Sequence, residues 1–212
     1  MILPRKEFIE KFKAVSGALS VTESIAIMNI AALAPENGLW VEGGTHKGKS
    51  AMSALYGGHC NTFHLIDAEF EKEISTEEVV KNVSGVAKNK VTIALIIGSF
   101  QDYLKNSGGR YSFVFSDAGI HDDEVLEECK LLEDKLISGG ILCLHDYKNQ
   151  FCAVERAYDY LLSTGKFEEI EINWEPIFNY VNSENLEYGN SSWHQYPDLP
   201  HPPNFVGALM RK

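Results

Sequence analysis

A glycine-rich loop and three later aspartates are the residues of this sequence best placed to do chemistry. The loop runs Val41-Glu42-Gly43-Gly44-Thr45-His46-Lys47-Gly48-Lys49-Ser50 and follows a short apolar stretch. Glycines let the backbone approach a ligand closely, and a helix that begins at such a loop offers unpaired N–H groups to an anion. Asp67, Asp117 and Asp146 each end or follow a later apolar stretch. The pattern indicates a site for a polar small molecule.

The loop fits two motifs of different chemistry. The phosphate-binding motif of nucleotide hydrolases, G-x-x-x-x-G-K-[ST], is matched by Gly43, Gly48, Lys49 and Ser50. The acid-x-G-x-x-x-G loop of enzymes that use S-adenosylmethionine is matched by Glu42, Gly44 and Gly48. The G-x-G-x-x-G motif for a dinucleotide fails, because its middle glycine would fall on Thr45 or His46.

Residues around the loop favour the methyl-donor motif. The carboxylate of Glu42 would repel bound phosphates, whereas a sulfonium cofactor with a free amino group tolerates negative charge. Asp67 ends the second strand, where an acidic side chain can bind ribose hydroxyls. Residues 113–117 could still form the apolar strand and magnesium-holding aspartate of a nucleotide hydrolase or kinase. A phosphate-loop enzyme that uses Gly43–Ser50 therefore remains the alternative.

Helices and strands are predicted to alternate from Leu39 onward. Apolar stretches predict strands at residues 39–42, 62–67, 91–97, 111–116, 141–144, 167–173 and 204–210. The stretch 91–97 has the composition of a strand buried on both faces. A helix carrying Val125, Cys129, Leu132 and Leu136 on one face is predicted to end at Gly139-Gly140. This order predicts a Rossmann-like, doubly wound α/β fold: a mostly parallel sheet, helices on both faces and an antiparallel final strand.

The length of 212 residues predicts a single domain with four parts. These are an N-terminal helical extension (1–35), the core (36–173), an insertion or lid (174–203) and a final strand (204–212). The extension, in which Ser20 and Glu23 form a capping box, could cover the sheet or pack in a homodimer. Aromatic residues of the insertion could wall an acceptor pocket or anchor the loop, and these are Trp174, Phe178, Tyr180, Tyr188, Trp193 and Tyr196.

The amino-acid composition limits the kinds of molecule that this protein can bind. With 30 acidic against 19 basic residues the net charge is -11, so a nucleic acid is not expected as a partner and a small-molecule acceptor is. No apolar run approaches the roughly 20 residues that span a membrane, and the N-terminus lacks the apolar region of a signal peptide. The four cysteines show no zinc-site spacing and suit reduced thiols. We therefore expect a cytoplasmic protein.

Polar or glycine residues at the ends of the predicted strands would gather on one edge of the sheet, where ligands of such folds bind. From Leu39 to Tyr147 the chain resembles class I S-adenosylmethionine-dependent methyltransferases, most closely the family-24 group with small-molecule O-methyltransferases of the macrolide-sugar and catechol type. The segments that carry the resemblance are Val41–Ser50, Leu65-Ile66-Asp67, Gly98-Ser99-Phe100, Ser116–His121 and Gly139–Tyr147.

The resemblance implies a cofactor site and roles for its residues. S-adenosylmethionine would be bound by Glu42, Gly43, Gly44, Thr45, Gly48, Ser50, Asp67, Ala68, Gly98, Ser99, Phe100 and Asp117. Glu42 and Gly44 would line its methionyl end, Asp67 would bind the ribose hydroxyls, and Ser99 and Phe100 would flank the adenine. Without a ligand, Asp67 and Ser99 could equally serve as helix caps. A domain that binds the cofactor without catalysis is a further alternative.

Four residues are the candidate catalytic groups, and these are Asp117, His121, His145 and Asp146. In related O-methyltransferases two such carboxylates hold a divalent cation such as Mg²⁺, which the resemblance would place on Asp117 and Asp146. This chain has His145-Asp146 where an Asp-Asn or Asp-Asp pair is common, and imidazole is a poorer partner for a hard cation. His145 or His121 could instead act as a general base.

Overall fold

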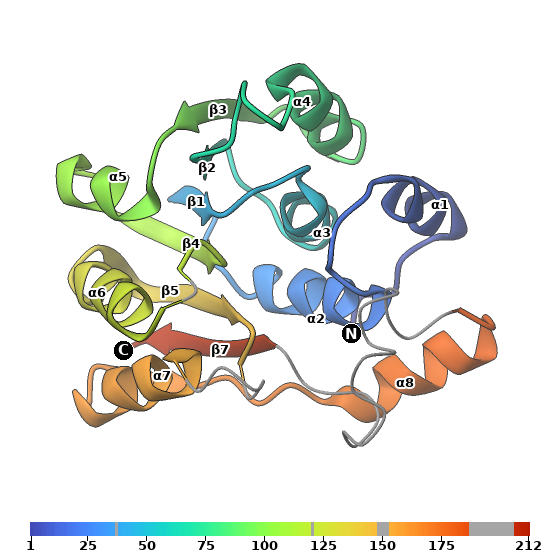
Figure 1. The fold of residues 1–212 in the computed structure, drawn as a ribbon. Coiled ribbons are helices and arrows are strands. Elements are labelled where there is room, and N and C mark those ends of the chain that lie inside the picture. The colour runs from blue at the N-terminus through green and yellow to red at the C-terminus, as the bar shows by residue number, and fades with distance from the viewer. Residues whose placement is uncertain (37, 120, 148–152, 187–205) are drawn as a thin grey trace.

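The fold is an α/β sandwich around one mixed sheet (Figure 1). The computed structural model describes residues 1–36, 38–119, 121–147, 153–186 and 206–212. Within them, seven strands pair in the order β3-β2-β1-β4-β5-β7-β6. The strands are β1 (Leu39–Gly43), β2 (Thr62–Asp67), β3 (Thr92–Ile97), β4 (Tyr111–Ser116), β5 (Leu136–His145), β6 (Phe167–Glu169) and β7 (Val206–Arg211). Strands β1 to β5 pair in parallel and β7 runs antiparallel to β5 and β6, which confirms the predicted fold class.

Helices cover both faces of the sheet. They are α1 (Lys6–Ala14), α2 (Val21–Ala31), α3 (Lys49–Gly57), α4 (Thr76–Ser84), α5 (Phe100–Asn106), α6 (Asp122–Glu133), α7 (Ala153–Ser163) and α8 (Trp174–Ser183). Figure 1 shows α2, α3 and α8 on one face, with α1 and α4 beside them, and α5, α6 and α7 on the other. No helix in the described parts of the chain is long and apolar enough to cross a membrane.

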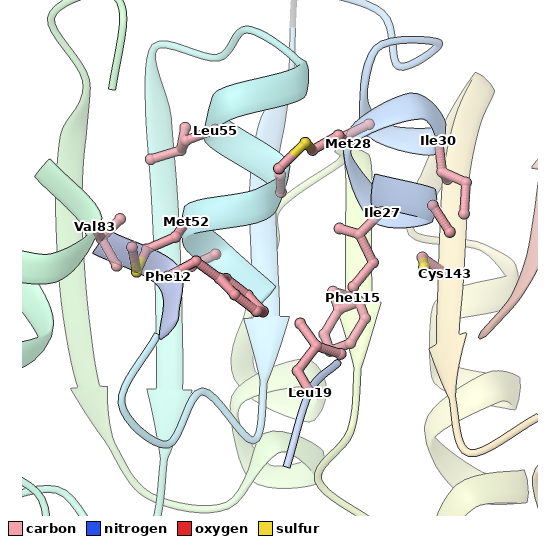
Figure 2. Close-up of a cluster of buried hydrophobic side chains, with 14 of the residues drawn as sticks. Phe12, Leu19, Ile27, Met28, Ile30, Met52, Leu55, Val83, Phe115 and Cys143 are labelled. Atoms are coloured by element: carbon pink, nitrogen blue, oxygen red, sulfur yellow. The ribbon is translucent and has the colours of Figure 1, made fainter. Parts of the chain in front are cut away.

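The N-terminal segment, expected as an extension, is part of the core. Ten of the eleven residues of α2 are buried, because the helix lies between the sheet, α3 and α8. A helix with apolar residues on most of its circumference needs such a buried position. Figure 2 shows Phe12, Leu19 and Ile27 of this segment in one cluster with Met52 of α3 and Phe115 of β4. Of the two predicted possibilities, α2 therefore covers the sheet.

Two predictions about the strands were wrong. β3, expected to be buried on both faces, is an edge strand of intermediate burial, because its apolar residues pair with β2 on one side only. Gly139 and Gly140 do not end a helix: α6 already ends at Glu133, and both glycines lie inside β5. Leu136 is buried as a strand residue, so its burial pattern alone could not assign it to the helix.

The insertion begins as a helix that packs away from the predicted site. The predicted strand at 167–173 is shortened to β6, and α8 follows it. The hydroxyl of Tyr180 donates to the carbonyl of Pro4 at 2.8 Å, and Trp174 stacks on Phe178 with ring centroids 5.9 Å apart. Tyr180 therefore ties α8 to the N-terminal segment, whereas the Trp174–Phe178 contact lies within α8. None of the three aromatic residues is among the lining of the predicted pocket. The others, Tyr188, Trp193 and Tyr196, lie outside the described residues.

Candidate functional site

A cavity of about 660 Å³ opens at the carboxyl ends of the parallel strands. Cavities of this size hold cofactor-sized ligands. Of the predicted site residues, it is lined by Gly44, Thr45, Ser50, Asp67, Ala68, Gly98, Ser99, Phe100, Asp117 and His145. Glu42, Gly43, Gly48, His121 and Asp146 are not among its lining residues. The structure thus brings most of the predicted residues together, and Glu42, Gly43 and Gly48 support the wall from behind.

The glycines of the loop are required by close packing as well as by backbone conformation. A Cβ on Gly43 would lie 2.2 Å from the ring of Phe100, and one on Gly44 would lie 2.4 Å from the carbonyl oxygen of Asp117. Gly44 and Gly48 also have φ angles of 78° and 85°, a region that side-chain-bearing residues rarely adopt. The sheet register explains the contact, since Gly43 pairs with Ser116, the residue before Asp117.

The side chains of Lys49 and Ser50 bind other protein groups and are therefore not available to bind a phosphate. The Lys49 ammonium donates to the carbonyl of Leu19 at 3.0 Å and lies 4.2 Å above the ring of Phe12. The hydroxyl of Ser50 donates to Oε1 of Glu42 at 2.8 Å. A phosphate loop needs this lysine on the phosphates and this hydroxyl on Mg²⁺. The geometry therefore opposes the phosphate-loop alternative.

Two buried polar atoms beside the loop have no partner among the described residues: Oε2 of Glu42 and the hydroxyl of Thr45. The Glu42 side chain is fully buried. Burial raises its pKa well above the usual range, the charges of Asp117 and Asp67 add to the rise, and the hydrogen bond from Ser50 is the largest opposing effect. An unsatisfied buried acceptor is costly. A ligand that brings a donor to this wall, such as an ammonium group, would relieve that cost.

Asp67 and Ser99 line the cavity from β2 and from the loop after β3. The carboxylate of Asp67 accepts from the backbone N–H groups of His46, at 2.7 Å, and Glu69, at 2.8 Å. Ser99 caps α5 by accepting from the N–H of Asp102 at 3.1 Å. Ser99 therefore has the capping role foreseen as its alternative. Asp67 caps no helix, because α4, the next helix along the chain, is capped by Ser75. Both Asp67 and Ser99 also face the cavity.

At the other end, His145 is enclosed by carboxylates. Its Nδ1 lies 3.1 Å from Oδ1 of Asp117 and its Nε2 lies 3.2 Å from Oε1 of Glu23. Burial alone would lower the pKa of His145, but Asp117 and Glu23 raise it well above the usual range. Both ring nitrogens are thus occupied, which leaves His145 no free lone pair with which to act as a general base. His121 is exposed at the N-terminus of α6, outside the cavity lining, and its role as a base stays a prediction.

The predicted metal site does not fit a divalent cation in this arrangement. Asp117, His145 and Asp146 each offer one potential ligand atom, and these atoms lie within 4.8 Å of one another. An imidazole ring that donates from both nitrogens has no lone pair with which to coordinate a metal. The positive charge of such a ring also repels a metal cation.

Several lining residues were not predicted from the sequence. The segment 17–19 was missed because the N-terminal part looked separate. Glu23 does not line the cavity but contacts His145, and it was missed because it already had a sufficient role in the capping box. Glu128 was also missed, although a signal existed: it follows Val125 by three residues and so shares the inner face of α6. Its carboxylate is 2% exposed and accepts from the hydroxyl of Ser116 at 2.8 Å.

Glu128 makes the stability of the protein depend on pH. Burial, reinforced by the charges of Glu124 and Asp117, raises its pKa from 4.5 to about 7. Because the folded state binds this proton more tightly, stability is greatest below the unfolded pKa and falls as pH rises from about 4.5 to about 7. We expect Glu128→Gln to raise the free energy of unfolding by about 1–3 kcal/mol at about pH 8 and to leave it nearly unchanged at about pH 4.

Urea unfolding of Glu128→Gln at both pH values measures this effect. Glu127→Gln is the matched control, because Glu127 is the neighbouring exposed residue, paired with Lys130 at 2.8 Å. An equal change at both pH values would show that the Glu128 carboxyl is not held protonated by the fold.

The fold recurs in solved methyltransferases of low sequence identity. An O-methyltransferase from Bacillus cereus in complex with S-adenosylhomocysteine is 11% identical, with a TM-score of 0.61 over 99% of this chain and 93% of that one. The O-methyltransferase TomG from Streptomyces achromogenes, in complex with S-adenosylmethionine, is 13% identical, with a TM-score of 0.61 over 100% and 92%. An rRNA methylase from Streptococcus thermophilus is 13% identical, with a TM-score of 0.55 over 88% and 93%. At identities this low, the similarity to these structures shows a shared fold.

The family follows from the sequence match. No match was found among curated proteins. The model of a methyltransferase domain matches residues 41–147, half of the chain, from β1 through the end of β5. These residues contain the glycine loop, Asp67, Asp117 and His145, all of which contribute to the one cavity. The chain therefore belongs to the methyltransferase-domain family, and the nucleotide-hydrolase alternative is set aside.

Proposed function

We propose that this protein transfers the methyl group of S-adenosylmethionine to a hydroxyl oxygen of a small molecule. The observation that carries the proposal is that a single cavity joins Asp67 and Ser99 at one side to Asp117 at the other. A ligand that spans the cavity would place its ribose and adenine near the first two residues and its reactive end near the third. This is the predicted orientation of the cofactor.

The wall of the cavity fits the methionyl end of the cofactor. The hydroxyl of Thr45, which lines the cavity, is a buried polar atom without a partner among the described residues, and a polar group of the ligand could satisfy it. The backbone N–H groups at the start of α3 suit a carboxylate. When bound, S-adenosylmethionine supplies a methyl group already activated on a sulfonium.

The protein then has to orient the acceptor and receive its proton. The Asp117 carboxylate is 36% exposed, faces the cavity and is fixed by Nδ1 of His145. It can accept a hydrogen bond from an acceptor hydroxyl and so aim that oxygen at the methyl group. On transfer of the methyl group to that oxygen, Asp117 would receive the hydroxyl proton and release it to solvent.

The charge of the site favours a small acceptor over RNA, although rRNA methylases share the fold. The cavity is lined by the acidic residues Asp67, Glu69, Asp117, Glu124 and Glu128. Its one lysine, Lys49, is bound to backbone carbonyls. A surface of this sign repels phosphates. Cys60, Cys129 and Cys143 are buried free thiols, which suits the proposed cytoplasmic location.

Calorimetry with S-adenosylhomocysteine and with ATP–Mg²⁺ tests the cofactor. We expect binding of the first and none of the second, and binding of ATP alone would sink the proposal. A screen for transfer of a labelled methyl group then compares small hydroxylated molecules with ribosomal RNA. Labelling of a hydroxyl is expected, whereas labelling of RNA alone would replace the small acceptor by a nucleic acid. Binding without transfer to any acceptor would favour the non-catalytic alternative.

A further inference from the structure

The acceptor end of the cavity is built around a histidine that three carboxylates surround. His145 ends β5, and its ring contacts Glu23 of α2 and Asp117 after β4 at hydrogen-bond distance. The carboxylate of Asp146, the next residue along the chain, lies 3.7 Å from Nδ1. The ring itself is 9% exposed and Glu23 is 1% exposed. Such a buried cluster needs a physical explanation, because uncompensated charge in the interior is costly.

Hydrogen-bond chemistry fixes the state of the ring. An ionised carboxylate only accepts, so a histidine whose two nitrogens both contact carboxylates must donate from both. An imidazole that donates from both nitrogens is a cation. The two contacts, 3.1 Å from Nδ1 to Asp117 and 3.2 Å from Nε2 to Glu23, thus require an N–H on each ring nitrogen. The cluster therefore consists of a positive ring between negative side chains.

Glu23 is itself held in place before any ligand arrives. Its Oε2 accepts from the backbone N–H of Ser20 at 2.7 Å, and the Ser20 hydroxyl accepts from the N–H of Glu23 at 3.2 Å. This capping box leaves Oε1 for the ring of His145. A side chain bound at both oxygens has little freedom, so Glu23 fixes the plane of the imidazole and, through Nδ1, the carboxylate of Asp117.

We propose that His145, clamped between Glu23 and Asp117, provides the fixed positive charge at the acceptor end of the cavity, so that the protein acts without a divalent cation there. Glu23 is the positioning residue of this clamp. The inference rests on the proposed function, because that function places the methyl acceptor next to Asp117. The ring carries its charge on two N–H groups, both used by carboxylates, and it therefore excludes a metal from the position that it occupies.

The state of the ring is tested on the full chain without an acceptor. Nuclear magnetic resonance of the protein labelled with ¹⁵N at its seven histidines, with His145→Gln to identify the signals, reports which ring nitrogens carry protons. At neutral pH we expect protons on both nitrogens of His145. In Glu23→Gln, whose amide oxygen still accepts from Ser20, we expect the doubly protonated signal to weaken or vanish. A single protonated nitrogen in the unaltered protein would overturn the proposal.

Metal binding provides a second test. Calorimetric titration with Mn²⁺ is expected to show no binding to the unaltered protein at millimolar concentrations. The double variant Glu23→Gln/His145→Asp replaces the ring by a carboxylate beside Asp117 and Asp146, and we expect it to bind Mn²⁺ at least about tenfold more tightly. Binding to the unaltered protein that is lost in Asp117→Asn would contradict the proposal. So would a double variant that retains the far-ultraviolet circular dichroism of the unaltered protein but gains no affinity.

Activity separates a positioning role from a merely structural one. Once a methyl acceptor is known, we expect a chelator to leave turnover unchanged. We expect Glu23→Gln to lower kcat about tenfold, while the Kd for S-adenosylhomocysteine stays within about twofold. Glu10→Gln, an exposed carboxylate of α1, is the control. Loss of turnover on chelation would overturn the proposal. Failure of the protein to bind S-adenosylhomocysteine would instead refute the proposed function, and the resonance and Mn²⁺ results would still decide the state of the clamp.

Discussion

Gly44→Ala should abolish measurable binding of S-adenosylhomocysteine, with a loss of affinity of about 100-fold or more, and should destabilise the fold by about 2–4 kcal/mol. Two effects add at this position. The φ angle of 78° costs an alanine about 1–2 kcal/mol. The new Cβ would also lie 2.4 Å from the carbonyl oxygen and 2.6 Å from the carbonyl carbon of Asp117, which are backbone atoms.

The clash acts directly on the site. To accommodate a methyl group, either the loop after β1 or the loop after β4 must move, and Gly44 and Asp117 both line the cavity. Movement of either loop separates the Gly44 wall from the Asp117 carboxylate. Since a displacement of about 1 Å is enough to spoil alignment in an active site, the effect on transfer should exceed that on stability.

Gly165→Ala is the matched control for this prediction. Gly165 has a nearly equal φ of 71°, but a Cβ there would meet nothing within 4 Å, and it lies in the turn between α7 and β6. It should therefore show the conformational cost without the clash. Urea unfolding and calorimetry with S-adenosylhomocysteine measure both effects. If the two variants lost equal stability and both still bound the ligand, packing at Gly44 would not support the cofactor site.

The parts of the fold that local sequence signals determine could be predicted. Alternating apolar runs, with glycine or aspartate after each, specified the five parallel strands and the edge where their ends meet. The same signals placed Gly44, Asp67 and Asp117 around one site. They could not distinguish an edge strand from a central one, because β3 is as apolar as its neighbours although one side of it is unpaired.

The parts of the site that depend on long-range packing could not be predicted. Glu23 and His145 are separated by 122 positions in the chain, and their contact exists only because α2 packs on the sheet beside the end of β5. Locally, the capping box already explained Glu23, and a general base or metal ligand explained His145. Only the fold shows that the two side chains complete each other's hydrogen bonds.

Asp117→Asn should lower kcat for methyl transfer by about 100-fold or more, the contribution typical of a group that receives a proton in the transition state. The change keeps the size of the side chain, and the amide oxygen can still accept from Nδ1 of His145, which now lies 3.1 Å from Oδ1. The charge that would receive the acceptor proton is lost. The methionyl wall at Glu42 and Thr45 is untouched, so the Kd for S-adenosylhomocysteine should change by less than about threefold.

Steady-state kinetics with the acceptor found in the screen, together with calorimetry, separate these two effects. Glu168→Gln is the control for the change in net charge, since Glu168 is exposed on β6 and pairs with β7 at the far edge of the sheet. A loss confined to cofactor affinity would assign Asp117 to cofactor binding alone, as its contact with the Gly44 wall also allows. A loss confined to kcat is expected, because the clamp on His145 directs this carboxylate toward the cavity and leaves its charge for the acceptor.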